Sequence, residues 1–419
     1  MKSRLVFLTK TFPFSTGEEF ISNELPVIAG KFEKVILIAT SVPDSAMQTR
    51  VVPENTEVHA IPASAVKRAL RPGAVKYCFS CPSEFRSKPE KQAVGHSPTR
   101  RLYFSYFLSK GLSVARKASE ILAKTDLDKA DAVTFYSYWF YDTALAALVL
   151  KQACRAPKCA AYCRAHGYDL YPARNSFNYL PLRPYLLRNL DGVFPCSEDG
   201  GDYLKRTYPE FADRIVPSYL GTTDHGLGPV PDGGEFHIVS CCHISPLKQV
   251  DLLSGALAKL AGSGLKLKWT HFGGGDGFDS LQKSAADHLG FMKAEFAGET
   301  GNGQLMDFYR THPVDLFVNT SRWEGLPVSI MEACSFGIPV LATDAGGTKE
   351  IVKNGKNGFL VGTDISPDAL AREIERICRM SEEDQNALRS ASREVWEKSF
   401  NAAVNYERFA HRIMPESAE

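Results

Sequence analysis

The sequence of 419 residues lacks any long hydrophobic run. A membrane-spanning helix needs roughly 18 or more consecutive apolar residues, and the first apolar stretch, Leu5–Thr9, is far shorter and predicts a buried strand. The beginning of the sequence also lacks the basic, apolar and cleavage-site regions of a signal peptide. We therefore expect a cytoplasmic location, with peripheral attachment at the inner face of the plasma membrane as an open alternative.

An excess of charge of one sign is also absent, because 49 basic and 48 acidic side chains leave a net charge of +1. This balance excludes a globally basic nucleic-acid binder, and we expect no nucleic-acid partner. The ten cysteines are scattered, and no second pair joins Cys78 and Cys81 to complete a zinc-type ligand set. We therefore expect reduced thiols and no metal site.

Short β-rich segments alternate with helical patterns along the chain, which is typical of parallel sheets covered by helices. The length favours two domains, and the glycine- and proline-rich segment 221–235 is the predicted linker. We predict an α/β fold with two Rossmann-like domains over 1–225 and 226–398 and a ligand-binding cleft between them. A C-terminal helix over 399–419 is expected to pack back on the first domain. Strands are predicted at Arg4–Thr9, Val35–Ala39, Glu57–Ile61, Ala132–Ser137, Cys159–Cys163 and Gly192–Cys196, then at Phe236–Cys242, Leu265–Phe272, Ala294–Ala297, Asp315–Asn319 and Pro339–Thr343.

The first predicted strand is followed by a turn through Pro13 and Gly17 and then by an amphipathic helix over Glu18–Ala29. Thr16 and Glu19 have the spacing of a capping box, in which the two side chains satisfy the free amides of a helix start. The pattern predicts that the helix begins there.

The segment 60–117 is strongly basic, since twelve lysine and arginine side chains are opposed only by Glu84 and Glu90. Aromatic residues interleave with the basic ones over Arg100–Lys110, inside a predicted helix over Arg101–Lys124. A basic, aromatic helix can lie on an anionic membrane surface. A solvated loop followed by a helix that buries its aromatic residues in the core explains the same pattern, and the sequence leaves both interpretations open.

The segment Ser321–Glu332 carries the most specific chemical signal. It follows a predicted strand, Gly325 permits a tight turn, and Pro327 suits the first position of a helix. The amides of Val328 and Ser329 would then lack partners within the helix, and with the positive end of the helix dipole they form a natural diphosphate site. A carboxylate more than one turn further on, Glu332, can accept hydrogen bonds from vicinal hydroxyl groups.

Glu324 and Glu332 in Trp-Glu-Gly-Leu-Pro-Val-Ser-Ile-Met-Glu resemble the E-x₇-E signature of retaining GT-B glycosyltransferases of family four (glycosyltransferase group 1). The continuation through 335–361, including Gly346, Gly347 and Glu350, resembles the same family, whose members act in bacterial capsular and exopolysaccharide biosynthesis. The resemblance is strong over Phe236–Val361 and weaker before it.

The resemblance implies a role for each matching residue. Glu332 would bind the ribose hydroxyls of an NDP-sugar, with UDP or GDP expected, and Lys248 would neutralise its diphosphate. The family usually has an arginine where this sequence has His243, and histidine is a weaker cation. The expected catalytic residues are Glu324, Lys248 and His166, the last from Arg-Ala-His-Gly-Tyr-Asp; the other expected donor-binding residues are Gly17, His243, Gly325, Leu326, Val328, Ser329 and Gly274.

The resemblance further implies metal-independent transfer of a hexose-type sugar, with retention, to a hydroxyl of a glycan or lipid-linked acceptor, and no cofactor besides the sugar donor. Two alternatives stay open. The substitution at His243 would suit a catalytically silent GT-B partner subunit. A sugar-nucleotide epimerase on the same fold would release its product without any acceptor.

Overall fold

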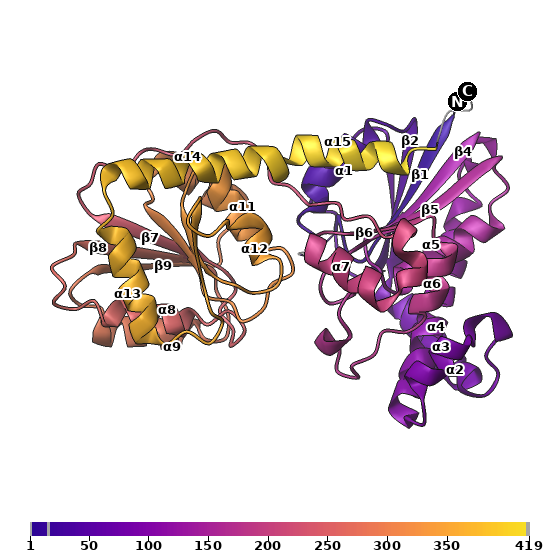
Figure 1. Cartoon of the computed structure of the whole chain (residues 1–419). Helices are drawn as coiled ribbons and strands as arrows, with labels where there is room; N and C mark the ends of the chain where they lie inside the picture. Colours follow the sequence, from indigo (N-terminus) through magenta and orange to yellow (C-terminus); the bar gives the residue numbers. More distant parts are fainter. Residues whose placement is uncertain (1, 15–16, 416–419) are drawn as a thin grey trace. The chain divides into compact units, whose positions relative to one another are not determined.

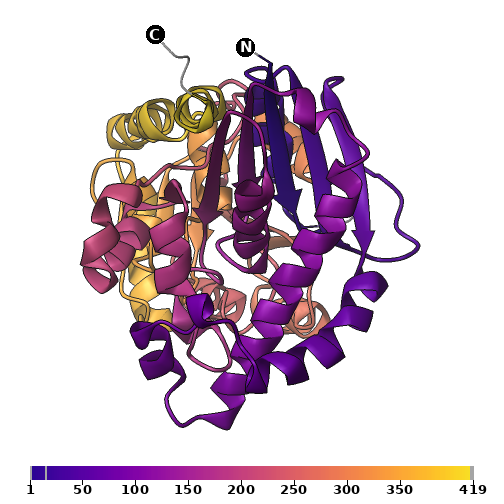
Figure 2. The same cartoon turned by 90° about the vertical axis from the view of Figure 1, so that its right-hand side faces the viewer.

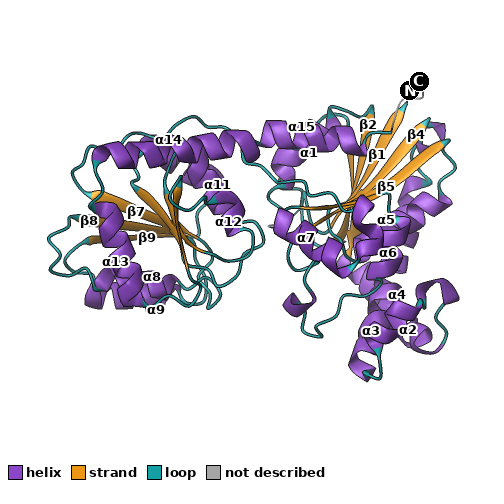
Figure 3. Ribbon diagram, in the orientation of Figure 1, coloured by secondary structure: helices purple, strands orange, loops and turns teal. Residues whose placement is uncertain are grey.

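The computed structural model describes residues 2–14 and 17–415 and, within these, no side chains over 68–75. It divides the chain into two compact units. The first comprises the residues up to Leu220 and those from Ala403 onward, and the second comprises Gly221–Ala402. The predicted α/β class with two Rossmann-like domains is confirmed, because each unit contains a six-stranded parallel sheet with helices around it (Figures 1 and 3).

The unit boundaries lie at 220/221 and 402/403 rather than at the predicted 225/226 and 398/399. Hydrogen bonds explain the shift. The amide of Thr222 donates to Phe400 O at 3.0 Å, and the amide of Ala402 donates to Thr222 O at 3.1 Å. Asp224 also pairs with Arg393 at 2.7 Å. The residues after Gly221 are thus bound to the second unit and do not form a free linker.

The first unit has the strand order β3-β2-β1-β4-β5-β6. Its strands are β1 Ser3–Thr9, β2 Lys34–Val42, β3 Thr56–Pro62, β4 Ala132–Ser137, β5 Lys158–Ala165 and β6 Gly192–Pro195. Its helices of seven residues or more are α1 Ile21–Ala29, α2 Ala63–Phe79, α3 Lys88–Val94, α4 Pro98–Leu122, α5 Asp142–Ala153, α6 Arg183–Asn189, α7 Glu198–Thr207 and α15 Ala402–Ile413. Because the chain runs outward from β1 and then returns to β4, the order reverses between these two strands.

The alternation of side chains along β1 determines which helices cover which face of this sheet. Val6 and Leu8 belong to a buried cluster that includes residues of α4 and α5. Leu5 and Phe7 point the other way, into a cluster with α1 and with Phe409 and Ile413 of α15. Both faces of β1 are therefore buried, as a continuous apolar run in a parallel sheet requires.

The start of α1 differs from the prediction. Of the proposed capping box, Thr16 lies outside the described residues. The helix begins at Ile21, its N-cap residue Phe20 makes no side-chain capping bond, and Glu18 has a positive φ of 56° instead of a helical one. Helix Glu18–Ala29 was thus predicted too long, because the Glu18 side chain bonds back to the loop after β1.

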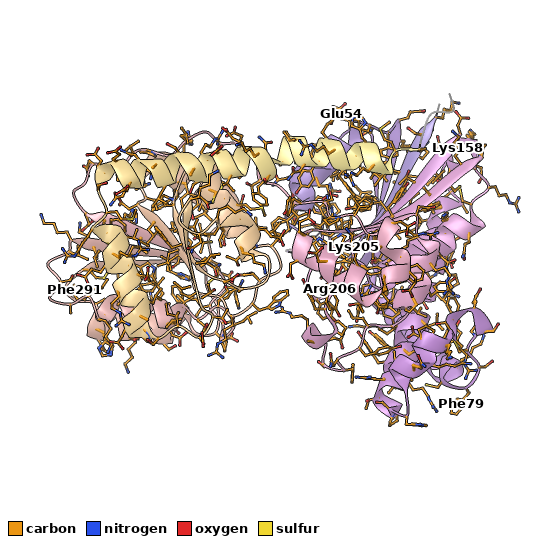
Figure 4. The ribbon with its side chains drawn as sticks, viewed as in Figure 1. Glu54, Phe79, Lys158, Lys205, Arg206 and Phe291 are labelled. Atoms are coloured by element: carbon orange, nitrogen blue, oxygen red, sulfur yellow. The ribbon has the colours of Figure 1, made fainter. Side chains whose placement is uncertain are left out.

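The basic segment 60–117 forms helices α2, α3 and α4, which extend beyond the sheet of the first unit in Figure 1. Phe104 and Phe107 of α4 are buried, as the core-packing interpretation requires. Leu102 and Tyr106 are exposed, and Phe79 is 86% exposed, with its side chain at the outer end of α2 in Figure 4. None of the described helices is both long and apolar enough to cross a membrane.

The second unit has the strand order β12-β11-β10-β7-β8-β9. Its strands are β7 Phe236–Cys241, β8 Leu267–Phe272, β9 Lys293–Gly298, β10 Leu316–Asn319, β11 Val340–Thr343 and β12 Gly358–Val361, and its helices are α8 Val250–Ala258, α9 Phe278–His288, α10 Asn302–Thr311, α11 Val328–Ser335, α12 Thr348–Ile351, α13 Pro367–Cys378 and α14 Glu382–Ser399. The order reverses between β7 and β10. Ligands of open α/β sheets bind at the carboxyl ends of the strands beside such a reversal.

Candidate functional site

Lys248 and Glu324 meet at the strand reversal of the second unit. Lys248 follows β7 and Glu324 follows β10, and the Lys248 Nζ lies 2.7 Å from Glu324 Oε1. Asn319, the last residue of β10, donates to the same Oε1 at 3.3 Å. The two charged residues, 76 positions apart in the chain, become partners because adjacent parallel strands end at the same edge of the sheet.

The backbone of Gly346 and Gly347 packs directly against the backbone of the Glu324 loop. Gly346 has a positive φ of 54°, and a Cβ atom there would lie 2.0 Å from Glu324 O. A Cβ atom at Gly347 would lie 2.3 Å from Gly325 O, to which the Gly347 amide donates at 2.9 Å. Only glycine allows this close approach of two backbones. This glycine pair lies in the segment that resembles the family, but its contact with the Glu324 loop was not among the expectations from the sequence.

Helix α11 begins at Val328, directly after the Glu324 loop. Pro327 is its N-cap residue and not, as predicted, its first helical residue. Val328 and Ser329 lie in the first turn and are half-buried, whereas Leu326 is buried. The amides of a first helical turn have no carbonyl partner within the helix and lie at the positive end of its dipole.

Glu332 lies in the middle of α11, where it accepts a hydrogen bond from Asn302 Nδ2 at 2.6 Å. Burial raises the pKa of Glu332 to about 7, and the Asn302 bond only partly opposes that shift. Asn302 is the first residue of α10. The sequence offered no signal for this contact, because 30 residues separate its partners.

The glycine-rich loop after β8 lies against the loop that carries His243. A Cβ atom at Gly273 would lie 2.0 Å from Cys242 O, and one at Gly275 would lie 2.5 Å from Ile244 O. Gly274 accepts a hydrogen bond from the Ile244 amide at 2.7 Å, and a Cβ atom there would lie 2.7 Å from Glu299 Cγ. His243 also borders a pocket of about 670 Å³, together with Ser245, Asp251, Asp276 and Ser280 among other residues.

The two expected site residues of the first unit follow different strands. Gly17, in the loop after β1, has a positive φ of 89° and donates its amide to Glu19 Oε1 at 2.6 Å. His166 follows β5, and its ring lies 4.7 Å from the rings of both Tyr138 and Trp139. Both ring nitrogens of His166 are covered, and among the described residues neither has a hydrogen-bond partner; Nδ1 lies 3.7 Å from Asp169 Oδ2.

Asp169 and Glu18 hold these loops in place, and the sequence analysis singled out neither as a site residue. Asp169 accepts from the His166 and Phe140 amides, each at 2.8 Å. Burial opposes ionisation of Asp169, but its interactions with His166 outweigh burial and lower its pKa. Glu18 accepts from the Thr11 and Phe12 amides at 2.8 Å and from Trp139 Nε1 at 2.6 Å.

Part of the chain is similar to a known protein family. Residues 229–395 match the family described as "Glycosyl transferases group 1". The putative colanic acid biosynthesis glycosyltransferase WcaL of Salmonella typhimurium is 36% identical over 251 residues, which are 57% of this chain and 61% of that protein. The O-antigen biosynthesis glycosyltransferase WbnH of Escherichia coli is 31% identical over 145 residues, 34% of this chain and 38% of that protein. The matched regions thus span 61% and 38% of these two curated relatives, less than two thirds of either.

Solved structures cover almost the whole chain. Anabaena HepE in complex with UDP and glucose has a TM-score of 0.63 at 17% identity and covers 98% of this chain and 99% of its own. The lipopolysaccharide outer core galactosyltransferase WaaB has a TM-score of 0.67 at 14% identity and covers 98% of each chain. Likeness at such low identity establishes the fold. The chain therefore has the two-domain GT-B fold, and its residues 229–395 match the glycosyl transferases group 1 family.

Proposed function

We propose that the protein is a glycosyltransferase of polysaccharide biosynthesis, which moves a sugar from a nucleoside diphosphate to a hydroxyl of a glycan or lipid-linked acceptor. The Lys248–Glu324 pair at the strand reversal, directly before the first turn of α11, carries the proposal. The names of the curated relatives support it, since they include colanic acid and O-antigen glycosyltransferases. So does the nucleotide in a solved neighbour, HepE, which was crystallised with UDP and glucose.

In the proposed donor complex, the diphosphate lies against the amides of Val328 and Ser329. These amides and the Lys248 ammonium stabilise the charge that grows on the leaving diphosphate, which is where electrostatic catalysis acts. Lys248 then divides its hydrogen bonds between Glu324 and the phosphate oxygens. This positive environment can replace a metal ion, and we propose metal-independent transfer.

Glu332 accepts hydrogen bonds from the ribose hydroxyls in this proposal, and Glu324 contacts the donor sugar. Because Asn302 already donates to Glu332, the ribose either displaces the amide or shares the carboxylate with it. We further propose retention of configuration at a hexose-type donor. The acceptor oxygen bonds to the anomeric carbon as the bond to the diphosphate oxygen breaks, and the acceptor proton passes to a phosphate oxygen. His166 contacts the donor sugar in this arrangement.

Attachment to the inner membrane surface is part of the same proposal, because a lipid-linked acceptor would be presented there. Phe79, Leu102 and Tyr106 are exposed on α2 and α4. The exposed basic side chains of this region include Lys67, Lys76, Arg86, Lys88, Lys91 and Arg101. Each basic residue near an anionic surface adds about 1 kcal/mol of attraction. Co-sedimentation with vesicles should rise with the anionic lipid fraction, and binding independent of that fraction would contradict the membrane proposal.

A thermal-shift panel of UDP, GDP and ADP with their common sugar conjugates tests the donor site. One nucleotide should stabilise the wild type, by about 2.7 kcal/mol at 100 times its Kd, and should lose most of this effect on Glu332→Ala. Glu383→Ala, on the exposed side of α14, is the matched control and should respond like the wild type.

Two alternatives make different predictions in the same experiments. A folded protein that no nucleotide stabilises would contradict the donor site and favour a silent partner subunit, for which the histidine at position 243 is the motivating feature. Conversion of an NDP-sugar to a free isomer without any acceptor would instead indicate an epimerase. Transfer to an added acceptor, with release of the nucleoside diphosphate, is the outcome that the proposal requires.

A further inference from the structure

The first unit has its own strand reversal, between β1 and β4, and a cluster of aromatic residues surrounds a lysine there. Lys10 follows β1, Trp139 and Tyr141 follow β4, and Tyr168 follows β5. The Lys10 Nζ lies 4.6 Å from the ring centre of Trp139, 5.4 Å from that of Tyr141 and 5.5 Å from that of Tyr168. We call these four residues the aromatic platform. The strands of this sheet point the same way in Figure 2, so the platform lies at their common carboxyl edge.

Hydrogen bonds hold the platform in one arrangement. The Glu18 carboxylate accepts from Trp139 Nε1 at 2.6 Å and from the Lys10 amide at 2.9 Å, which joins the loops after β4 and β1. The hydroxyls of Tyr141 and Tyr168 lie 3.4 Å apart. Glu18 itself has the positive φ of 56° described above, a strained backbone for a residue with a side chain. Such strain is found where a binding surface is preorganised.

The ammonium of Lys10 has no ion pair among residues 2–14 and 17–415, because no carboxylate of that part of the chain lies within ion-pair distance of it. Two acidic side chains of the same loops have other partners: Glu18 bonds to backbone amides and Trp139, and Asp142 pairs with Lys110 at 3.2 Å. Ring faces attract the ammonium but do not neutralise it. The Lys10 ammonium can therefore still pair with an anionic group of a bound molecule.

The platform is accessible and lies beside a proposed reaction residue. Tyr168 is 43% exposed, and Lys10 and Trp139 are half-buried. The Trp139 ring is in contact with His166, with 4.7 Å between ring centres. A molecule lying on Trp139 and Tyr168 would therefore be next to the residue that we place at the donor sugar. An acceptor hydroxyl must reach that position for transfer to occur.

We propose that the aromatic platform binds the acceptor, and that the acceptor is an anionic saccharide. The apolar face of a sugar ring packs on Trp139 and Tyr168, whose flat rings provide a large contact area. Lys10 donates to a carboxylate or phosphate group on the same or the adjoining sugar, as a charge-assisted hydrogen bond. This inference rests on the proposed glycosyltransferase function and specifies its acceptor class. A uronic acid and a sugar phosphate both provide the required anion.

A glycan array tests the platform against many saccharides at once. The array carries bacterial surface glycans in neutral, uronic-acid and phosphorylated forms, so that its arms separate the two sources of the anion. The full-length wild type should bind acidic glycans in preference to neutral ones. Lys10→Met and Tyr168→Ala should each bind them about tenfold more weakly or worse, as expected when one charge-assisted hydrogen bond or one ring face is lost. Lys158→Met, at the amino end of β5 (Figure 4), is the matched control and should bind like the wild type.

Nucleotide stabilisation of the same preparations keeps this test separate from that of the proposed function. Lys10→Met and Tyr168→Ala should keep the melting temperature and the nucleotide-induced shift of the wild type, which shows that both variants fold and retain the donor site. Preference for neutral glycans, equal binding by wild type and Lys10→Met, or no binding to any glycan despite a normal nucleotide shift would each overturn the platform. If no nucleotide raises the melting temperature of the wild type, that result would instead contradict the proposed donor site.

Discussion

The guanidinium of Arg164 donates to the carboxylate of Glu24 at 2.9 Å, and both side chains are completely buried. The hydroxyl of Tyr136 donates to the other carboxylate oxygen at 2.5 Å, and the guanidinium lies 4.0 Å from the ring centre of Phe409. This pair thus joins α1, β4, β5 and the C-terminal helix α15 in the core of the first unit.

Glu24→Ala should strongly destabilise the first unit, because it leaves the Arg164 charge buried without a partner. The expected loss is about 3–5 kcal/mol in the free energy of unfolding. Urea unfolding followed by circular dichroism measures the change. Glu120→Ala removes an exposed partner of Lys117 and should leave the stability nearly unchanged. The double variant Glu24→Gln with Arg164→Met should recover part of the loss, and equal stability of Glu24→Ala and wild type would contradict the role of the pair.

Lys248→Met should reduce kcat by about 10²–10³-fold, the effect of removing one group that stabilises charge in a transition state. Turnover of the NDP-sugar identified by thermal shift measures the effect. Lys259→Met removes an exposed lysine just after α8 and should leave kcat unchanged. An unchanged kcat in Lys248→Met would show that Lys248 pairs with Glu324 but does not stabilise charge in the transition state.

Nucleotide binding should weaken as the pH falls through about 7, because Glu332 must be ionised to accept two hydroxyl hydrogen bonds and its pKa is raised to about 7. Isothermal titration from mildly acidic to mildly basic pH measures this dependence. Glu332→Gln should bind weakly at every pH and show no such step. A wild-type affinity that is constant over this range would contradict the role of the ionised carboxylate.

The same raised pKa affects stability. The folded chain holds the Glu332 proton more tightly than the unfolded chain does, so this group's stabilising contribution is complete below its ordinary pKa of 4.5 and is lost as the pH rises through about 7. Above that pH, Glu332→Gln should therefore melt at a higher temperature than the wild type. An identical melting temperature for the two proteins at mildly basic pH would contradict the raised pKa of this carboxyl.

Gly347→Ala should reduce turnover without unfolding the protein, since its methyl group would lie 2.3 Å from Gly325 O and displace the loop of Glu324. The expected loss is at least about tenfold in kcat, by analogy with other displacements of catalytic groups. Gly290→Ala is the matched control, because a Cβ atom there meets no atom within 4 Å. Full activity in Gly347→Ala would show that the loop tolerates the shift.

The sequence predicted much of the second unit because its signals are local. Strand β10 and helix α11 follow from an apolar run, a glycine and a proline that lie close together in the chain. The segment around Glu324 and Glu332 could therefore be identified from its own residue types and spacing. The start of α1 was wrong for the opposite reason: Glu18 bonds to amides across the loop, and this contact outweighs the local capping pattern of Thr16 and Glu19.

The sequence by itself determined the α/β class, eleven of the twelve strands in their order, and the places of Lys248 after β7, Glu324 after β10 and Glu332 within α11, because periodicity and turn residues act over a few positions. It did not predict strand β12 or helices α2 and α3. Only the tertiary structure decided which of these side chains contact one another. Lys10 with Trp139, Lys248 with Glu324 and Asn302 with Glu332 meet because parallel strands from distant parts of the chain end at one edge of a sheet. Their charges and rings are visible in the sequence, but the distances between them depend on how the sheet and its helices pack.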